Sequence, residues 1–239
     1  MGYAHALSGC AAWLAMGPAF AATGRPLGPG DVIAGALVCA GAALVPDLDH
    51  PSSTIAKTYG VVSQAMSRVI EKAAGGHRQG THSLLFALLV GIGCQLLQIA
   101  SELALQVFLF LLLGIALRGI GFHVPKHGII SGVMNAASTV VVLVLLNLAV
   151  TDYSWVGAAV TLGILMHFLG DAVTHMGIPL FWPLKTRSEF PFGFKTDGKV
   201  ERFVVTPLLI VTILVLGYLQ LPILPDVPGL PSSGEVQQT

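Results

Sequence analysis

The 239-residue sequence has little charge, no net charge and few cysteines. Asp, Glu, Lys and Arg make up 10% of it, whereas they make up roughly a quarter of a typical soluble protein. The 12 basic and 12 acidic residues balance, so there is no basic surface to attract nucleic acid. Cys10, Cys39 and Cys94 lie in apolar stretches without a CxxC pair, and we interpret them as buried apolar side chains. The composition therefore argues against a soluble domain and against a nucleic-acid-binding protein.

Apolar residues dominate instead: 54% of the sequence is hydrophobic and the mean hydropathy is +0.79. A helix needs roughly 20 mostly apolar residues to cross the hydrocarbon core of a bilayer. The first apolar stretch lacks the Lys/Arg-rich start of a signal peptide, so we count it as a span. The sequence predicts seven spans, at about 5–22, 31–46, 83–101, 103–121, 129–150, 155–175 and 203–221.

The second predicted span is short and the sixth is polar near its end, so either can be tilted or re-entrant. We expect an all-α fold, a polytopic transmembrane helical bundle of about seven spans. Residues 1–221 would form a single domain, and the Pro/Gly/Ser-rich residues 222–239 a disordered tail.

The connection over residues 51–82 is too long for a simple loop and contains a helical pattern. Arg68, Glu71 and Lys72 lie opposite a set of apolar residues, which comprises Val61, Val62, Ala65, Met66, Val69 and Ile70. This spacing predicts an amphipathic helix. Such a helix can lie on the membrane surface or pack against its own protein, and the sequence leaves both arrangements open.

Seven crossings distribute the positive charges unevenly. Residues 47–82, 122–128 and 176–202 then share one face, and every Lys and Arg except Arg25 lies on or beside it. Because positive residues in short loops stay on the cytoplasmic side, we expect this face to be cytoplasmic. An even number of spans would remove the asymmetry.

All eight histidines lie at or near the same face, together with Asp47, Asp49 and Asp171. Ionisable groups at a membrane edge are costly unless they are paired, bound to a ligand or hydrated, so this cluster argues for a site. Imidazoles and carboxylates are ligands of zinc, manganese and iron. In His167-Phe-Leu-Gly-Asp171, the spacing puts both polar side chains on one helix face, where both can reach one metal ion. A simple His–Asp pair at a helix end is the alternative.

Two loop motifs supply further candidates. Between Pro46 and Pro51, Asp47 and Asp49 can converge in an irregular turn, although the same residues also suit a helix cap. The segment 75–83 contains glycines that allow close backbone approach, and it places His77, Arg78 and His82 together. The imidazoles can bind metal, and the guanidinium suits a phosphate-like anion. A polar loop at the membrane interface is the alternative.

Five separated segments resemble the YdjM family. They are residues 2–8 with His5, residues 44–53, residues 76–85, the pattern His167-x-x-x-Asp171-x-x-Thr174-x-x-Gly177-x-Pro179-Leu180-x-Trp182-Pro183, and Glu201-Arg202. The resemblance covers most of residues 1–85 and 160–205. That family is described as predicted inner-membrane, metal-dependent hydrolases, similar in sequence pattern to the zinc-dependent phospholipase C group. The metal ligands that it implies are His5, Asp47, Asp49, His77, His82, His167 and Asp171. His50, His123, His127 and His175 stay open as further candidates.

We therefore expect a membrane-embedded hydrolase acting on a phosphoester of a membrane lipid or of a membrane-proximal molecule. Two or three divalent ions, with Zn²⁺ as the expected metal, would lower the pKa of a bound water. Asp47, Asp49 or Asp171 would bridge the ions or orient that water, and Arg78 would neutralise charge on the phosphoryl oxygens. Membrane lipids are the expected partners, and nucleic acid is not expected.

Two other classes remain open. A metal-ion or proton transporter would carry ionisable groups across the whole bilayer, whereas the spans have few away from the histidine-rich face. A noncatalytic membrane adaptor would use metal to fix its loops. Its metal would have a closed shell of four protein ligands, whereas a catalytic ion keeps an open position.

Overall fold

A computed structural model describes residues 2–122, 128–174, 177–184, 186–187 and 198–221. Over these ranges the chain is all-helical, which confirms the predicted fold class. The α helices are α1 (Gly2–Leu14), α2 (Gly17–Ala22), α3 (Pro29–Ala42), α4 (Val61–Ala74), α5 (Leu84–Ala100), α6 (Glu102–Gly119), α7 (Gly128–Ala149), α8 (Val156–Ala172) and α9 (Thr206–Gln220). Short turns of helix, η1 (Pro46–Asp49), η2 (Ile55–Lys57), η3 (Gly80–His82) and η4 (Glu201–Val205), lie between them.

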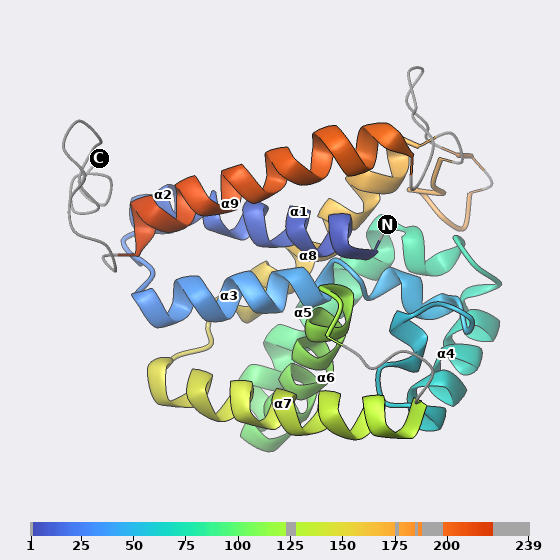
Figure 1. Cartoon of the computed structure of the whole chain (residues 1–239), viewed down its shortest axis with the longest axis horizontal. Helices are drawn as coiled ribbons and strands as arrows, with labels where there is room; N and C mark the ends of the chain where they lie inside the picture. Colours follow the sequence, from blue (N-terminus) through green and yellow to red (C-terminus); the bar gives the residue numbers. More distant parts are fainter. Residues whose placement is uncertain (1, 123–127, 175–176, 185, 188–197, 222–239) are drawn as a thin grey trace.

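Helix α3 is the centre of the bundle. Helices α1, α6, α7 and α8 all contact it, and α9 packs against the outer side of α1 (Figure 1). Val38, Cys39 and Ala42 of α3 have no exposed surface. These side chains are small, so the neighbouring helices approach the α3 backbone closely.

Two glycines allow close approaches of this kind near the candidate site. Gly9 of α1 and Gly163 of α8 both lie against the backbone carbonyl oxygen of Cys39, and a Cβ at Gly9 would be 2.6 Å from that oxygen. One helical turn from this contact, at the end where α1 begins and α3 and α8 end, the same helices bring His5, Ala43 and His167 to one level. The glycine contacts therefore position the first residues of the candidate site.

Four helices among the described residues are long and apolar enough to cross a membrane: Pro29–Asp49, Glu102–Gly119, Gly128–Ala149 and Glu201–Gln220. The second predicted span is thus longer than expected, because η1 extends α3 to 21 residues. The first predicted span is interrupted: α1 ends at Leu14, and α2 restarts at Gly17 with Pro18, whose ring nitrogen has no N–H to continue the helix. Helices α5 and α8 are shorter apolar helices. The predicted count of seven spans is therefore not confirmed.

The amphipathic helix predicted from the sequence is present as α4, and its apolar face points outward. Ser63 and Ser67 are its buried residues, and the Ser67 hydroxyl donates to the carbonyl oxygen of Leu48 over 2.5 Å. Val61 and Val62, by contrast, are 78% and 77% exposed. The helix therefore packs through its serines and Ile70, and it leaves Val61, Val62 and Val69 largely uncovered by the described part of the chain. Of the two arrangements left open above, this favours the membrane surface.

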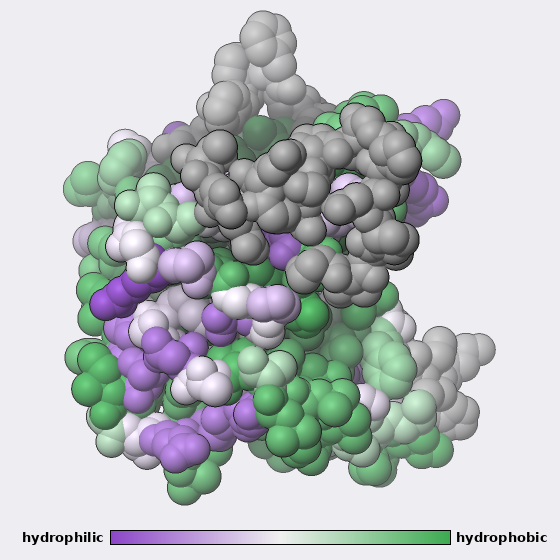
Figure 2. All heavy atoms as spheres, turned by 90° about the vertical axis from the view of Figure 1, so that its left-hand side faces the viewer, coloured by the Kyte–Doolittle hydropathy of each residue, from purple (hydrophilic) through white to green (hydrophobic). Residues whose placement is uncertain are grey.

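The end of the bundle where α3 begins is also polar; it is opposite the end where α3 and α8 finish. Figure 2 views the end that lies on the left of Figure 1, where hydrophilic side chains gather over part of the surface and hydrophobic ones border them. Asp31 at this end accepts hydrogen bonds from Gly28 N at 3.0 Å and from Trp155 Nε1 at 3.1 Å. It therefore caps α3 and ties α8 to it. The predicted tail over 222–239 lies outside the described residues.

Candidate metal centre

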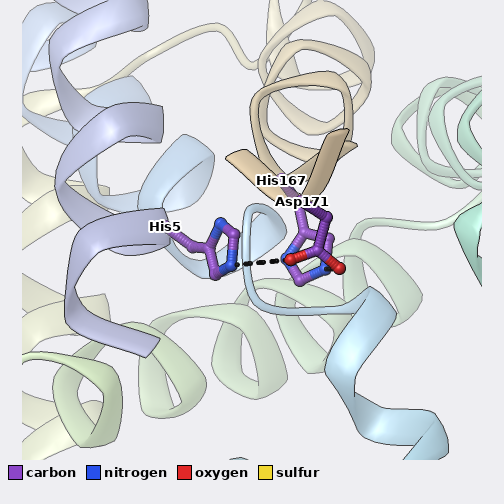
Figure 3. Close-up of side chains that lie close together, drawn as sticks. All are labelled: His5, His167 and Asp171. Atoms are coloured by element: carbon purple, nitrogen blue, oxygen red, sulfur yellow. Dashed lines mark ion pairs between the residues drawn. The ribbon is translucent and has the colours of Figure 1, made fainter. Parts of the chain in front are cut away.

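Helix ends that are distant in sequence meet beside the beginning of α1. His5 comes from α1, Asp47 from η1, His82 from η3, and His167 and Asp171 from α8. Figure 3 shows His5 pointing from α1 towards Asp171 and His167 on α8. The imidazole rings of His5 and His167 stack with their centroids 4.1 Å apart. The convergence expected from the motifs is therefore present for these five residues.

The donor atoms of these residues are close together. His167 Nε2 lies 3.1 Å from His82 Nε2, and Asp171 Oδ2 lies 3.5 Å from His82 Nε2 and 3.6 Å from His167 Nε2. Two further residues flank these three: His5 Nε2 is 3.4 Å from Asp171 Oδ1, and Asp47 Oδ1 is 3.9 Å from His167 Nε2. Two groups of three ligands, His5–His167–Asp171 and Asp47–His82–His167, have ligand atoms within 4.8 Å of one another. They share His167 and so form one centre.

Hydrogen bonding determines which nitrogen of His167 faces the centre. His167 Nδ1 lies 2.8 Å from the backbone carbonyl oxygen of Ala43. A carbonyl oxygen can only accept, so Nδ1 carries the proton and donates it. In the neutral ring, Nε2 is then an unprotonated lone pair that points towards the centre.

A chain of hydrogen bonds orients His82 in the same way. The Thr81 hydroxyl donates to Asp49 Oδ2 over 2.5 Å, and His82 Nδ1 lies 3.0 Å from the same hydroxyl oxygen. Because the single hydroxyl proton goes to Asp49, His82 Nδ1 must be the donor to Thr81. His82 Nε2 is then also a lone pair, and it faces His167 Nε2.

In their neutral forms, His82 Nε2 and His167 Nε2 thus direct lone pairs towards each other and towards the carboxylate of Asp171, with no hydrogen atom between the two nitrogens. His82, His167 and Asp171 are at most 1% exposed, so water does not offset their repulsion. Arg78 Nη2 forms an ion pair with Asp171 Oδ2 at 3.0 Å, but neither oxygen of Asp171 accepts a well-oriented hydrogen bond from the described residues. Donors about 2.0–2.1 Å from one tetrahedral zinc ion would lie about 3.3–3.4 Å apart. The observed separations of 3.1, 3.5 and 3.6 Å fit a bound cation.

Asp49 and His77, which the resemblance implied as ligands, lie outside both groups of three. Asp49 Oδ1 accepts from His77 Nδ1 at 2.6 Å, and its Oδ2 accepts from Arg78 N at 2.9 Å as well as from Thr81. The hydrogen bond with Asp49 raises the pKa of His77 above its ordinary value. These contacts favour a supporting role for Asp49, and direct metal binding by either residue stays a prediction.

Of the other candidate histidines, His50 lies in the described part of the chain, and it belongs to neither group of ligands. His50 is exposed, contacts Ser52 and lies beside His77 with the two rings tilted and their centroids 4.7 Å apart. His123, His127 and His175 lie outside the described residues.

Arg78 is held in an uncommon backbone conformation, with a φ of 56°. Non-glycine residues rarely adopt positive φ because Cβ then crowds the backbone, and such strain gathers at functional sites. The conformation lets Arg78 N bind Asp49 while its guanidinium reaches Asp171. Its Nη1 is buried without a hydrogen-bond partner among the residues described. A donor is thus free beside the candidate centre.

Sequence reasoning assigned no role to Thr81, Gly170 or Glu201. Thr81 sets the tautomer of His82, and its position directly before that histidine was the available signal. A Cβ at Gly170 would lie 2.7 Å from His5 Cε1, so only glycine lets that ring pack on α8. Glu201 is 3% exposed and lines a cavity of about 80 Å³ that also touches His5. The Glu201-Arg202 pair was noted only as part of the resemblance.

Comparison with known proteins identifies a family and relatives of this chain. The family model described as "YdjM inner membrane protein" matches residues 1–126 and 122–223. Two relatives, each named "Inner membrane protein YdjM", come from Escherichia coli (strain K12) and Shigella flexneri. Each is 25% identical over 170 residues, or 70% of this chain. The chain spans 59% of the length of each relative. No solved structure matches it.

Proposed function

Since the chain belongs to the YdjM family of inner membrane proteins, we propose that its buried cluster binds a divalent metal ion and hydrolyses a phosphoester with it. One observation carries the proposal: His82 Nε2 and His167 Nε2 face each other at 3.1 Å as lone pairs beside a buried carboxylate. A bound cation would stabilise that arrangement, because each neutral ring has already used its proton elsewhere.

We propose zinc as the metal and a single primary ion. Two imidazoles and one carboxylate, with a further position left for water or substrate, are typical of a catalytic zinc ion. His167 offers only one nitrogen, since Ala43 uses the other, so the two groups of three cannot each hold an ion through it. A second ion would need to share the Asp171 carboxylate, with Oδ1 on the side of His5.

The bound ion would supply a water molecule with a lowered pKa, which is ready to attack at neutral pH. Asp47 is the most exposed member of the two groups of three, at 23%, so water would reach the ion from its side. Arg78 Nη1 would donate to a phosphoryl oxygen as negative charge develops there. Asp171 would bind the ion and hold the guanidinium of Arg78. Asp49 would act as a positioning residue, because both of its oxygens already accept hydrogen bonds.

The positive charges of the sequence support a cytoplasmic location for this centre. Lys57, Arg68 and Lys72 belong to the connection that leads from α3 to α5, and Arg78 belongs to the centre itself. Positive residues close to membrane-spanning helices are retained in the cytoplasm. We therefore propose that hydrolysis takes place at the inner leaflet.

The experiment is a phosphoesterase assay on the purified full chain in detergent, with a fluorescent phospholipid as substrate. We expect turnover that stops after chelation, returns with added zinc, and is lost in Asp171→Asn. His50→Ala, which changes an exposed histidine outside both groups, should keep the activity. Turnover that survives complete metal removal, or equal losses in both variants, would reject the proposal.

The same protein in liposomes separates hydrolysis from transport and from an adaptor role. A transporter would show metal or proton flux that depends on His167. An adaptor would bind metal with neither flux nor turnover. The position of the cluster at one end of the bundle argues against a continuous pathway, since a pathway needs polar groups through the full thickness.

A further inference from the structure

A groove with mostly apolar walls lies between α4 and α5, beside the candidate centre. Its walls are formed by Ile70, Ala73, Leu85, Phe86, Leu89 and Trp182. Its volume is about 310 Å³, close to the lower end of the roughly 300–1,000 Å³ of small-molecule sites. The groove is therefore large enough to bind part of a ligand, and its lining selects an apolar one.

One part of the groove lining is polar and belongs to the centre. Thr81 and Ser83 line it there, but the Ser83 hydroxyl is already used by Gly80 O and Phe86 N. Thr81 contacts both Asp49 and His82. A ligand with an apolar chain in the groove and a polar end beside Thr81 would therefore lie next to a residue that contacts the candidate ligand His82.

The outer edge of the groove continues into surface that faces lipid. Leu85 and Leu89, which line the groove, are 46% and 62% exposed, and Leu88 beside them is 53% exposed. In a membrane protein, such a row of leucines on an apolar helix lies against acyl chains. The apolar face of α4 on the other wall is also exposed, as expected of an interfacial helix. Lipid can thus enter sideways, without leaving the bilayer.

One positive charge lies beside the centre, close to this polar part. Arg78 Nη2 forms an ion pair with Asp171 Oδ2 at 3.0 Å, and its Nη1 is buried without a partner among the described residues. Guanidinium groups are suited to phosphate oxygens. The apolar walls and the Arg78 guanidinium together therefore fit one kind of molecule, an anionic phospholipid.

We infer that the groove between α4 and α5 seats an acyl chain of an anionic phospholipid, whose phosphate lies beside Thr81 at the metal centre. This inference rests on the proposed function, because it names the substrate class of the same site. It assigns the apolar groove to substrate binding, and it assigns α4 to holding the groove at the level of the lipid headgroups.

Tryptophan fluorescence can report occupancy of the groove directly. The sequence has three tryptophans, and Trp182 is the one that lines the groove, whereas Trp13 and Trp155 are 1% and 5% exposed in the core. We would titrate the metal-free full chain in detergent with phosphatidic acid that carries bromine, a contact quencher, on one acyl chain. We expect saturable quenching that disappears in Trp182→Phe.

Matched substitutions test whether the lipid is in the groove or only near it. Ala73→Phe fills the groove and should weaken the apparent affinity about tenfold. Ala65→Phe adds the same ring to the same helix outside the groove and should change it less than about twofold. If Ala73→Phe does not fold, Leu85→Phe and its control Leu88→Phe provide the same comparison from α5. Equal quenching in the wild type and the groove-filling variant would overturn the inference.

Two further outcomes separate this inference from the proposed function. Groove-dependent quenching without any metal-dependent hydrolysis would support the lipid site and reject the enzyme. Metal-dependent hydrolysis together with quenching that is unchanged in Ala73→Phe would support the enzyme and overturn the lipid site. A neutral brominated diacylglycerol that binds as tightly as phosphatidic acid would overturn the assignment of an anionic headgroup.

Discussion

Replacing His167 with alanine tests the centre at the residue that both groups of ligands share. The change removes the Nε2 that lies 3.1 Å from His82 Nε2 and 3.6 Å from Asp171 Oδ2. Loss of a supporting residue outside the coordination shell already lowers metal affinity about 10–100-fold. Loss of one of the three innermost donors should cost more, so we expect a decrease of at least about 100-fold, or about 2.7 kcal/mol.

The measurement is zinc affinity and stoichiometry on purified wild type and His167→Ala, by elemental analysis after dialysis and by competition with a chromophoric chelator. His50→Ala is the matched control, because it removes an exposed histidine from the neighbouring turn without touching either group. Thermal unfolding gives a second readout. Zinc at about 100 times its dissociation constant should stabilise the wild type by about 2.7 kcal/mol and leave His167→Ala unchanged.

Wild-type zinc affinity in His167→Ala would refute the reasoning, because no described arrangement of the centre lacks this nitrogen. An equal loss in His50→Ala would refute it as well. Zinc would then be bound by scattered surface histidines, and the convergence of the buried lone pairs would have no functional meaning.

Three further predictions concern the supporting structure. Asp49→Asn should lower zinc affinity about 10–100-fold in the same competition assay. The amide has one acceptor oxygen where the carboxylate has two, so it cannot accept from His77, Arg78 N and Thr81 together, and the hydrogen bonds that set the tautomer of His82 are disturbed. Unchanged affinity would contradict this chain of hydrogen bonds. In metal-free protein, the raised pKa of His77 should stabilise the fold. This stabilisation is fully present below pH 6.5, the ordinary pKa of histidine, and is lost as pH rises through the higher pKa of the folded state. The melting temperatures of wild type and His77→Gln should therefore converge with increasing pH, and a constant difference between them would contradict this prediction. Gly163→Ala should lower the free energy of unfolding by about 1–3 kcal/mol in a detergent melt, because its Cβ would overlap the α3 backbone, whereas Gly93→Ala, with nothing within 4 Å, should not destabilise; similar losses in both would show that the close helix contact is unimportant.

Much of the fold could be predicted from the sequence because a bilayer imposes a simple rule on composition. Apolar stretches of sufficient length must be helical, since every backbone group needs a partner within its own segment. Each of the seven predicted stretches does contain a helix, and the amphipathic pattern at 61–72 does form α4. The break after Leu14 was harder to predict, because Gly17 and Pro18 interrupt a stretch that is apolar throughout.

The sequence also limited which residues could belong to the candidate site. Ionisable residues are rare within membrane spans without a reason, so the histidines and aspartates predicted at one face gave a set of candidates that includes the five converging residues. The spacing of His167 and Asp171 on one helix correctly placed both on the same side. None of this depends on how the helices pack.

Only the tertiary structure decided which of these residues face the centre and which hold the others in place by hydrogen bonds. Asp47 and Asp49 are two positions apart and chemically identical, yet Asp47 faces His167 while Asp49 is surrounded by His77, Arg78 and Thr81. The direction of a side chain in an irregular turn depends on contacts with segments far away in the sequence. The same holds for the outward apolar face of α4, which is set by the buried contact of Ser67 with η1. Composition and periodicity are local properties and determine which segments are helices and which residues are available, whereas donors and acceptors become paired only once the helices have packed.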